Sequence, residues 1–358
     1  MERDFIDKLL KAGVGYGASD IHFKVGSAPS YRVDGTLRSL KSEPLKPSDT
    51  VAIVQLLCAR ASEQPDIESL REFDTSYSVP GTARFRVNVY RQRGTLSVIL
   101  RIIPGAVPTI ESLGLPDRVK GFAEEERGLV LVTGATGSGK TSTLAALINH
   151  INQNRAVHIL TIEDPIEFLH KNAKASVSQR EIGIDTSNFQ IALRSALRQD
   201  PDVILVGEMR DTETVDIALK AAETGHMVYS TVHTTDASKT INRLIAMFPP
   251  EEQGAIRWRL AEILKGTVSQ RLLPNADGRG RTMACEIMVS TETVKEYIRD
   301  ASRTSGLKDV LEKGSNTYGM QTFDQHMIKL VKAKKITLDV ARSAASSPAD
   351  FERALNFE

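Results

Sequence analysis

The sequence of 358 residues has no long hydrophobic run, few cysteines and no excess of charge of either sign. No stretch of 18 apolar residues occurs, so we expect no direct insertion into a membrane. The first ten residues mix charged with apolar side chains, unlike a signal peptide. Two cysteines, Cys58 and Cys285, form no Cys-x-x-Cys pair, which argues against a thiolate zinc site or a disulfide framework. We expect both to be buried in a protein of the reducing cytosol.

The usual signals of nucleic-acid binding are also scarce. Lysine and arginine number 46 against 45 acidic residues, a formal charge of +1, and aromatic residues make up 5% of the chain. Proteins that bind nucleic acid usually present a basic groove and aromatic side chains on which bases stack. We therefore expect no nucleic-acid partner. Hydrophobic residues at 41% and charged residues at 25% are ordinary for a globular protein, and the length suggests about two domains.

The first third of the chain predicts a mixed domain of short helices and strands. Apolar spacing indicates a helix over residues 1–12, and Ser48 or Asp49 is a candidate cap for a second helix. The turn at Asp34-Gly35 suggests one hairpin, and Gly94 lies between two alternating runs that suggest another. Prolines 104, 108 and 116 then interrupt the pattern. We place a domain boundary there, with domains over 1–115 and 116–358.

From residue 128 onward, predicted strands alternate with predicted helices. That alternation is typical of an α/β domain with a parallel sheet and helices on both faces. From about residue 293 the chain predicts a tail of helices, with caps at Thr322 and Thr337. The expected strands cover 128–133, 157–162, 203–206, 227–232, 268–273 and 282–289, and the expected helices 141–152, 188–198, 212–223 and 251–265.

A phosphate-binding loop lies between the first of these strands and the first of these helices. The run from Gly134 to Thr141 fits the pattern G-x-x-x-x-G-K-[ST], whose glycines let backbone N–H groups turn toward phosphates. Lys140 would neutralise the β and γ oxygens, and the Thr141 hydroxyl would ligate Mg²⁺. We therefore expect ATP and Mg²⁺ to bind here. The candidate nucleotide-binding residues are Gly134, Ala135, Thr136, Gly137, Ser138, Gly139, Lys140, Thr141 and Ser142.

Polar residues follow three more strands of the same predicted sheet. Glu163, Glu208 and His233 each come directly or nearly directly after a strand, and ligands bind outside the carboxyl ends of parallel strands. Glu208 is the candidate for holding Mg²⁺ or its water shell, and Glu163 for orienting or deprotonating the attacking water. Asp164 or Glu167 could share that role, and a helix cap before Pro165 is a competing interpretation. His233 is a candidate γ-phosphate sensor.

Phosphoryl transfer needs positive charge at the transition state, and the chain offers several arginines for it. Arg194 and Arg198 are predicted to lie four apart on one helix face, and Arg210 follows Glu208. For any single arginine, solvent exposure without a role is an equally good interpretation. The candidate arginines of the first domain are Arg84, Arg86, Arg91, Arg93 and Arg101.

Taken together, the motifs resemble the type II/IV secretion ATPase superfamily. The runs that begin at Gly134, Thr161, Leu197 and Gly225 resemble its Walker A, aspartate-box, Walker B and histidine-box motifs, in that order. S-D-I-H-F at Ser19 and G-M-Q-T-F-D-Q at Gly319 resemble the pilus retraction (PilT-type) branch, so the likeness covers nearly the whole chain.

The resemblance implies a hexameric motor ATPase with a PAS-like first domain and a RecA-like second domain. It implies that Glu163 is the catalytic glutamate, Glu208 the Walker B glutamate and His233, with His226, part of the histidine box. Arg86 and Arg101 match the first-domain arginines that reach the γ-phosphate in this family. It further implies a cytoplasmic protein docked at the inner-membrane base of a pilus machine, with an inner-membrane platform protein as partner.

Two absences favour retraction over assembly within this superfamily. Assembly ATPases usually carry an extra N-terminal domain and a tetracysteine zinc motif, whereas only about 130 residues precede this P-loop and residues 272–283 hold no cysteine. One departure favours an accessory paralogue. Retraction ATPases carry a helix motif close to A-I-R-N-L-I-R-E, which is only partly matched by T-V-K-E-Y-I-R-D at Thr293.

The rival interpretations are an assembly or type II secretion ATPase, a RecA-like nucleic-acid motor, and a non-enzymatic scaffold gated by nucleotide. Retention of both Glu163 and Glu208 disfavours the scaffold, and an ATPase assay separates it from the motors.

Overall fold

In a computed structural model, which describes residues 3–59, 61, 64–103 and 105–357, the chain forms two compact units. The first two residues of the predicted helix over 1–12, and Pro104 of the predicted boundary, lie outside the described residues. Unit 1 comprises Met1–Val107, Asp164–Leu169 and Arg180–Asn188, and unit 2 comprises Pro108–Glu163, His170–Gln179 and Phe189–Glu358.

The division between the units differs from the predicted domains over 1–115 and 116–358. Ile110 and Leu115 are buried in the core of unit 2, so the chain joins that unit from Pro108 onward. In addition, the chain leaves unit 2 after Glu163 and again after Gln179, and each time contributes a segment to unit 1. Unit 1 is therefore built from three pieces of sequence.

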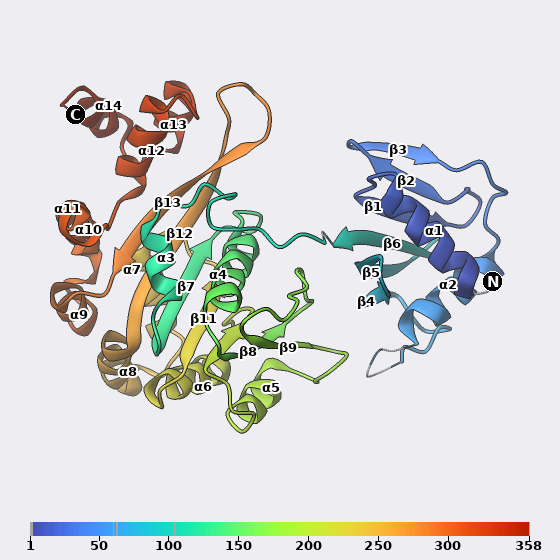
Figure 1. The fold of residues 1–358 in the computed structure, drawn as a ribbon, viewed down its shortest axis with the longest axis horizontal. Coiled ribbons are helices and arrows are strands. Elements are labelled where there is room, and N and C mark those ends of the chain that lie inside the picture. Colours follow the sequence, from blue (N-terminus) through green and yellow to red (C-terminus); the bar gives the residue numbers. More distant parts are fainter. Residues whose placement is uncertain (1–2, 60, 62–63, 104, 358) are drawn as a thin grey trace. The chain divides into compact units, whose positions relative to one another are not determined.

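Unit 1 has one sheet of six antiparallel strands in the order β3-β2-β1-β6-β5-β4 (Figure 1). The predicted hairpins join β2 to β3 and β5 to β6. Asp34-Gly35 and Arg93-Gly94 both have positive φ, as tight hairpin turns require. The helices and strands are α1 (Arg3–Gly15), β1 (Asp20–Lys24), β2 (Ser30–Val33), β3 (Thr36–Ser39), α2 (Pro47–Cys58), β4 (Glu72–Val79), β5 (Ala83–Gln92) and β6 (Thr95–Ile103).

The predicted start of α2 was wrong by about two residues. Lys46 is the N-cap and Pro47 occupies the first turn, where its missing N–H costs nothing. Asp49 lies inside the helix, and its carboxylate accepts the Lys46 backbone N–H at 2.8 Å. Asp49 thus stabilises the helix start from within the first turn rather than from the cap position.

Unit 2 has one sheet of seven strands in the order β13-β12-β7-β11-β10-β8-β9. Strands β12, β7, β11, β10 and β8 pair in parallel, whereas β13 pairs antiparallel with β12. In Figure 1, α4 crosses in front of this sheet. The elements up to β13 are α3 (Arg118–Ala123), β7 (Gly128–Gly134), α4 (Lys140–Asn154), β8 (His158–Glu163), β9 (Ser176–Glu181), α5 (Phe189–Ala196), β10 (Val203–Val206), α6 (Thr212–Glu223), β11 (Met227–Val232), α7 (Ala237–Ile245), α8 (Pro250–Ile263), β12 (Leu264–Pro274) and β13 (Arg281–Val289).

The rest of unit 2 is a series of short helices, as the sequence predicts. Thr322 and Thr337 cap two of them through their hydroxyl groups. No helix among the described residues is long and apolar enough to cross a membrane. The helices are α9 (Glu292–Arg299), the 3-10 helix η1 (Thr304–Gly306), α10 (Leu307–Lys313), α11 (Ser315–Tyr318), α12 (Phe323–Lys332), α13 (Leu338–Ala344) and α14 (Pro348–Phe357).

Candidate nucleotide-binding and hydrolysis site

The loop between β7 and α4 has the backbone that phosphate binding needs. Gly134, Gly137 and Gly139 have φ values of 146°, 77° and 90°, which other residues rarely adopt. A Cβ at Gly134 would lie 2.6 Å from the Gln270 carbonyl oxygen and 2.4 Å from Ser138 Oγ. The loop therefore tolerates no larger residue at its first position, and α4 begins with its N-terminus at the end of the loop.

Side chains within this loop fit an anionic ligand. The Lys140 ammonium is buried and donates to the carbonyl oxygens of Gly134 and Ala135, each at 3.0 Å. Ser138 Oγ is buried and, among the described residues, lacks a hydrogen-bond partner. A buried hydroxyl without a partner is costly, and a phosphate oxygen in the loop would satisfy it. These features support nucleotide binding by the predicted residues.

The carboxyl ends of four neighbouring parallel strands carry the predicted polar residues. Strands β7, β11, β10 and β8 are adjacent in that order. They lead into the P-loop, His233, Glu208 and Glu163 respectively. The predicted gathering of these groups along one sheet edge is therefore present in the fold, as expected for strand-end residues of an open α/β sheet.

Glu208 lies between two potential cations. Its Oε2 is 3.3 Å from His233 Nε2, and its Oε1 is 2.5 Å from Arg210 Nε. The Glu208 side chain is largely buried, whereas Arg210 is exposed. A carboxylate fixed in this way can ligate a metal ion or its waters, and His233 is connected to it directly.

Mg²⁺ would find only a partial protein coordination sphere here. Among the described residues, no group of three or more His, Cys, Asp or Glu side chains could hold a metal ion. Magnesium usually keeps several waters and binds through one or two protein ligands together with substrate phosphates. The Thr141 hydroxyl and the Glu208 carboxylate therefore stay the predicted protein ligands of the ion.

Glu163 is the last residue of β8 and accepts hydrogen bonds from two neighbours. Thr161 Oγ1 donates to Glu163 Oε1 at 2.6 Å, and Gln179 Nε2 donates to the same oxygen at 3.2 Å. Sequence reasoning missed Gln179, because a lone glutamine in a polar strand matches no motif. Only its place on β9, next to β8 in the sheet, gives it significance.

The structure does not support three other interpretations of the polar residues near these strands. No helix begins between Glu163 and β9, so the helix-cap interpretation before Pro165 was wrong. Asp164 and Glu167 belong to unit 1, whereas Glu163 belongs to unit 2. His226 precedes β11, so it lies at the opposite edge of the sheet from His233, and its Nδ1 is 2.9 Å from the Ala221 carbonyl oxygen.

Comparison with known proteins decides the family. The sequence matches the family described as type II/IV secretion system protein over residues 1–348. The chain belongs to this family. The type IV pilus retraction ATPase PilT of Pseudomonas aeruginosa is 44% identical over 346 residues, which cover 97% of this chain and 99% of PilT. The type IV pilus ATPase PilU of the same organism is 39% identical over 344 residues, which cover 96% of this chain and 89% of PilU.

A solved structure of the pilus retraction motor PilT with bound ADP has the same fold. It superposes with a TM-score of 0.87 at 43% identity, covering 97% of this chain and 99% of that chain. The expected likeness to the retraction branch of the type II/IV secretion family is therefore confirmed, as is a mixed α/β fold with two sheets.

The predicted first-domain arginines, Arg86 and Arg101, both belong to unit 1. They lie directly opposite each other on β5 and β6, and both are exposed. Arg101 Nε also donates to Asp20 Oδ1 at 3.0 Å. Two of the other candidates of unit 1 are engaged in contacts within that unit. Arg84 forms an ion pair with the buried Glu181, and Arg91 donates to four backbone carbonyl groups.

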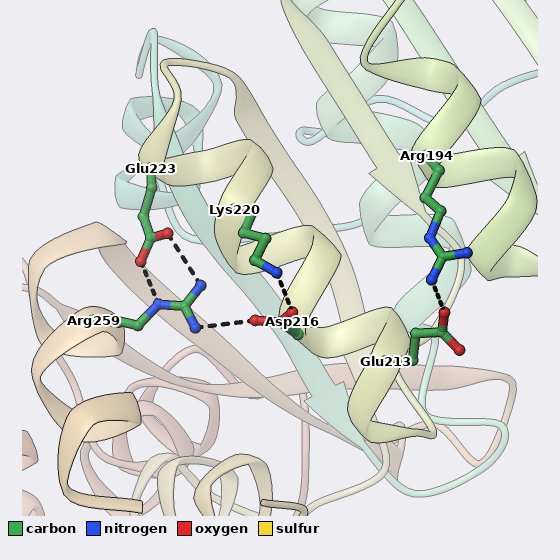
Figure 2. Close-up of polar contacts among 6 residues, drawn as sticks. All are labelled: Arg194, Glu213, Asp216, Lys220, Glu223 and Arg259. Atoms are coloured by element: carbon green, nitrogen blue, oxygen red, sulfur yellow. Dashed lines mark hydrogen bonds and ion pairs between the residues drawn. The ribbon is translucent and has the colours of Figure 1, made fainter. Parts of the chain in front are cut away.

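The predicted pair Arg194 and Arg198 does not share a helix face. Helix α5 ends at Ala196, so Arg198 lies in the turn beyond it. Arg194 forms an ion pair with Glu213 at the start of α6 (Figure 2). Farther along α6, Figure 2 shows Arg259 of α8 bound to both Asp216 and Glu223. Arg194 therefore joins a set of contacts that connects α6 with its neighbouring helices.

Proposed function

We propose that this protein is the motor ATPase that drives retraction of a type IV pilus. The observation that carries the proposal is likeness over nearly the full length of PilT, together with the P-loop and the polar strand ends that ATP hydrolysis requires. The chain is an ATPase. Its first unit corresponds to the PAS-like domain and its second unit to the RecA-like domain of such motors.

The residues at the sheet edge divide the work of hydrolysis. Backbone N–H groups of the loop and the Lys140 ammonium bind the β- and γ-phosphates of ATP. Thr141 and Glu208 hold Mg²⁺, which when bound offsets the negative charge of the phosphates. Glu163 orients the attacking water and accepts its proton, and His233 responds to the γ-phosphate through its contact with Glu208.

The working form is a hexameric ring in the cytoplasm, docked against an inner-membrane platform protein of the pilus machine. Arg86 and Arg101 complete the positive charge that one lysine and Mg²⁺ cannot supply alone. Closure of the first unit upon ATP binding and its opening after product release would convert hydrolysis into movement, which is a common hinge mechanism.

Retraction is favoured over assembly because no cysteine lies within residues 272–283 and the match to PilT runs from end to end. The partial match at Thr293 and the 39% identity to PilU keep an accessory retraction ATPase as the second candidate.

Deletion of the gene in its host tests the proposal. We expect abundant surface pili with loss of twitching, restored by the wild-type gene but not by a Lys140→Ala variant, which lacks the buried cation of the P-loop. Piliation is scored by electron microscopy and twitching by colony spreading. Bald cells would instead assign the protein to pilus assembly.

A further inference from the structure

The carboxylate of Glu163 is held by a short chain of hydrogen bonds that crosses from β8 to β9. Its Oε1 accepts from the buried Thr161 hydroxyl and from the Gln179 amide. The orientation of that amide is fixed in turn, because the His170 backbone N–H donates to Gln179 Oε1 at 2.8 Å. With its oxygen occupied by a donor, the amide presents its NH₂ group to Glu163.

Glu163 and Gln179 also occupy equivalent places in the chain. Each is the last residue of its segment in unit 2, and the next residue, Asp164 or Arg180, belongs to unit 1. The Glu163–Gln179 hydrogen bond thus joins the two strands at the point where both leave unit 2. Any change in the path of either segment therefore acts on this hydrogen bond.

Within unit 1, a second link joins the same two segments. Glu181, only 1% exposed, accepts the Ile166 backbone N–H at 2.9 Å and forms an ion pair with Arg84 of β5. A buried carboxylate with a charged partner and a backbone donor is strongly held. The two inserted segments are therefore fixed to the sheet of unit 1 just beyond Gln179.

We propose that Gln179 is a positioning residue for Glu163, which sets the direction of the carboxylate toward the attacking water. The inference rests on the proposed role of Glu163 as the catalytic base. Catalysis needs the reacting groups held within about 0.5 Å of the productive geometry, and a carboxylate at the end of a strand has rotational freedom unless its oxygens are bonded. The hydrogen bonds from Thr161 and Gln179 restrict this rotation. Gln179 is also the last residue before the chain leaves unit 2 for the second time.

Steady-state kinetics of the full-length protein test the proposal. Gln179→Ala should lower kcat about tenfold or more, as expected for a misplaced reacting group, while KM for ATP stays within about twofold. Thr161→Val should act in the same direction, and Thr161→Ser, which keeps the hydroxyl, should restore activity. Gln199→Ala is the matched control, because Gln199 is exposed and its amide donates to Ser195 Oγ at the end of α5.

The pH profile separates positioning from a merely structural role. Gln179→Glu keeps the size and the acceptor for the His170 N–H but turns a carboxylate toward Glu163. A nearby like charge, or the loss of a donor, raises the pKa of a carboxyl group. The acid limb of kcat should therefore move to higher pH in Gln179→Glu and, by less, in Gln179→Ala. A structural defect would lower kcat equally at all pH values.

Glu163→Gln, measured in the same assay, shows whether a negative result concerns the proposed role of Glu163 or only that of Gln179. If Glu163→Gln hydrolyses ATP at the wild-type rate, the proposed role of Glu163 is wrong and the inference falls with it. If Glu163→Gln is inactive while Gln179→Ala keeps wild-type kcat and an unmoved pH profile, the inference alone is overturned. A rise in KM with unchanged kcat would likewise overturn it, because Gln179 would then serve nucleotide binding.

Discussion

At the scale of single residues, the two glutamates of the site contact different side chains. Glu208 has a guanidinium on one side and an imidazole on the other. Glu163 accepts hydrogen bonds from uncharged donors, a hydroxyl and an amide. Contacts to both oxygens hold the Glu208 carboxylate in place, as a ligand of a metal ion or its waters needs to be, whereas the hydroxyl and the amide orient the Glu163 carboxylate. The contacts therefore support separate roles, metal binding for Glu208 and water activation for Glu163.

Replacing each glutamate by glutamine tests this division. Glu163→Gln should bind ATP normally but hydrolyse it at least about a hundredfold more slowly, because general-base catalysis is lost. Glu208→Gln should also be slow, but extra Mg²⁺ should recover part of its activity, since it has lost a metal ligand. ATP binding by fluorescence and phosphate release over a magnesium titration would measure both effects. Normal hydrolysis by Glu163→Gln would move the base to Asp164 or Glu167.

At the scale of elements, the loop after β11 is held by a buried carboxylate from β13. Glu286 is 6% exposed, and its Oε1 accepts the Ala237 N–H at 2.8 Å at the start of α7, four residues beyond His233. Burial raises the pKa of Glu286 to about 7, and Asp236 adds to this, while Arg271 and Lys308 oppose it. The group thus stays protonated in the folded protein at pH values where it would ionise in the unfolded chain.

The raised pKa of Glu286 predicts a stability that depends on pH. Between its unfolded pKa of 4.5 and its folded pKa of about 7, the folded state binds more protons, so stability falls as pH rises. The loss is complete above that window and amounts to about 3 kcal/mol at 1.4 kcal/mol per pKa unit. Glu286→Gln, which keeps the size and an acceptor for Ala237, should match the wild type at pH 5 and exceed its stability at pH 8. Urea midpoints from pH 5 to 8 measure this, and a constant difference would contradict it.

Elements with strong local patterns were predictable from sequence, and those defined by distant contacts were not. The apolar strand of residues 203–206 and the caps Thr322 and Thr337 were found correctly, because burial and capping leave local signals. Strand β9, with the sequence S-V-S-Q-R-E, was missed because its residues are mostly polar and half-buried. Because β9 was not predicted, neither the contact of Gln179 with Glu163 nor the second departure of the chain from unit 2 could be predicted.

The difference between local patterns and distant contacts also explains which parts of the site were predictable. Strand order cannot be read from one sequence, but the carboxyl ends of parallel strands must share an edge, and this placed Glu163, Glu208 and His233 together. The rule does not apply to His226, which precedes its strand. Arg198 was misplaced for another reason, because α5 ends at Ala196 and not at residue 198, and such boundaries are the least reliable part of a prediction.

At the scale of the whole molecule, the supply of positive charge is the open question of mechanism. Arg84 and Arg91 are engaged in contacts within unit 1, and Arg194 is paired with Glu213 in unit 2. Arg86 and Arg101 are exposed and lie directly opposite each other on adjacent strands, and Arg101 is also paired with Asp20. Like charges directly opposite on a sheet are unfavourable, so this pair would favour contact with a further anion.

We therefore expect Arg86→Ala and Arg101→Ala to bind ATP normally but to hydrolyse it at least about tenfold more slowly, because an arginine at the transition state typically contributes more than that. Exposed Arg38 on β3 offers a matched control, and Arg38→Ala should keep the wild-type rate. If either arginine variant kept that rate as well, the charge would have to come from another source.

Mixing variants then identifies which subunit supplies the charge. Lys140→Ala disables the P-loop and leaves Arg86 intact, while Arg86→Ala does the reverse. If the arginine serves the P-loop of its own chain through closure of its own first unit, as we expect, every subunit in a mixed version of the proposed ring carries one defect and the mixture stays slow. If it serves a neighbour, some sites regain both groups, and activity rises above the mean of the two variants. Phosphate release from rings assembled at several mixing ratios would measure this, and such a rise would contradict the same-chain mechanism because only adjacent subunits can exchange the missing group.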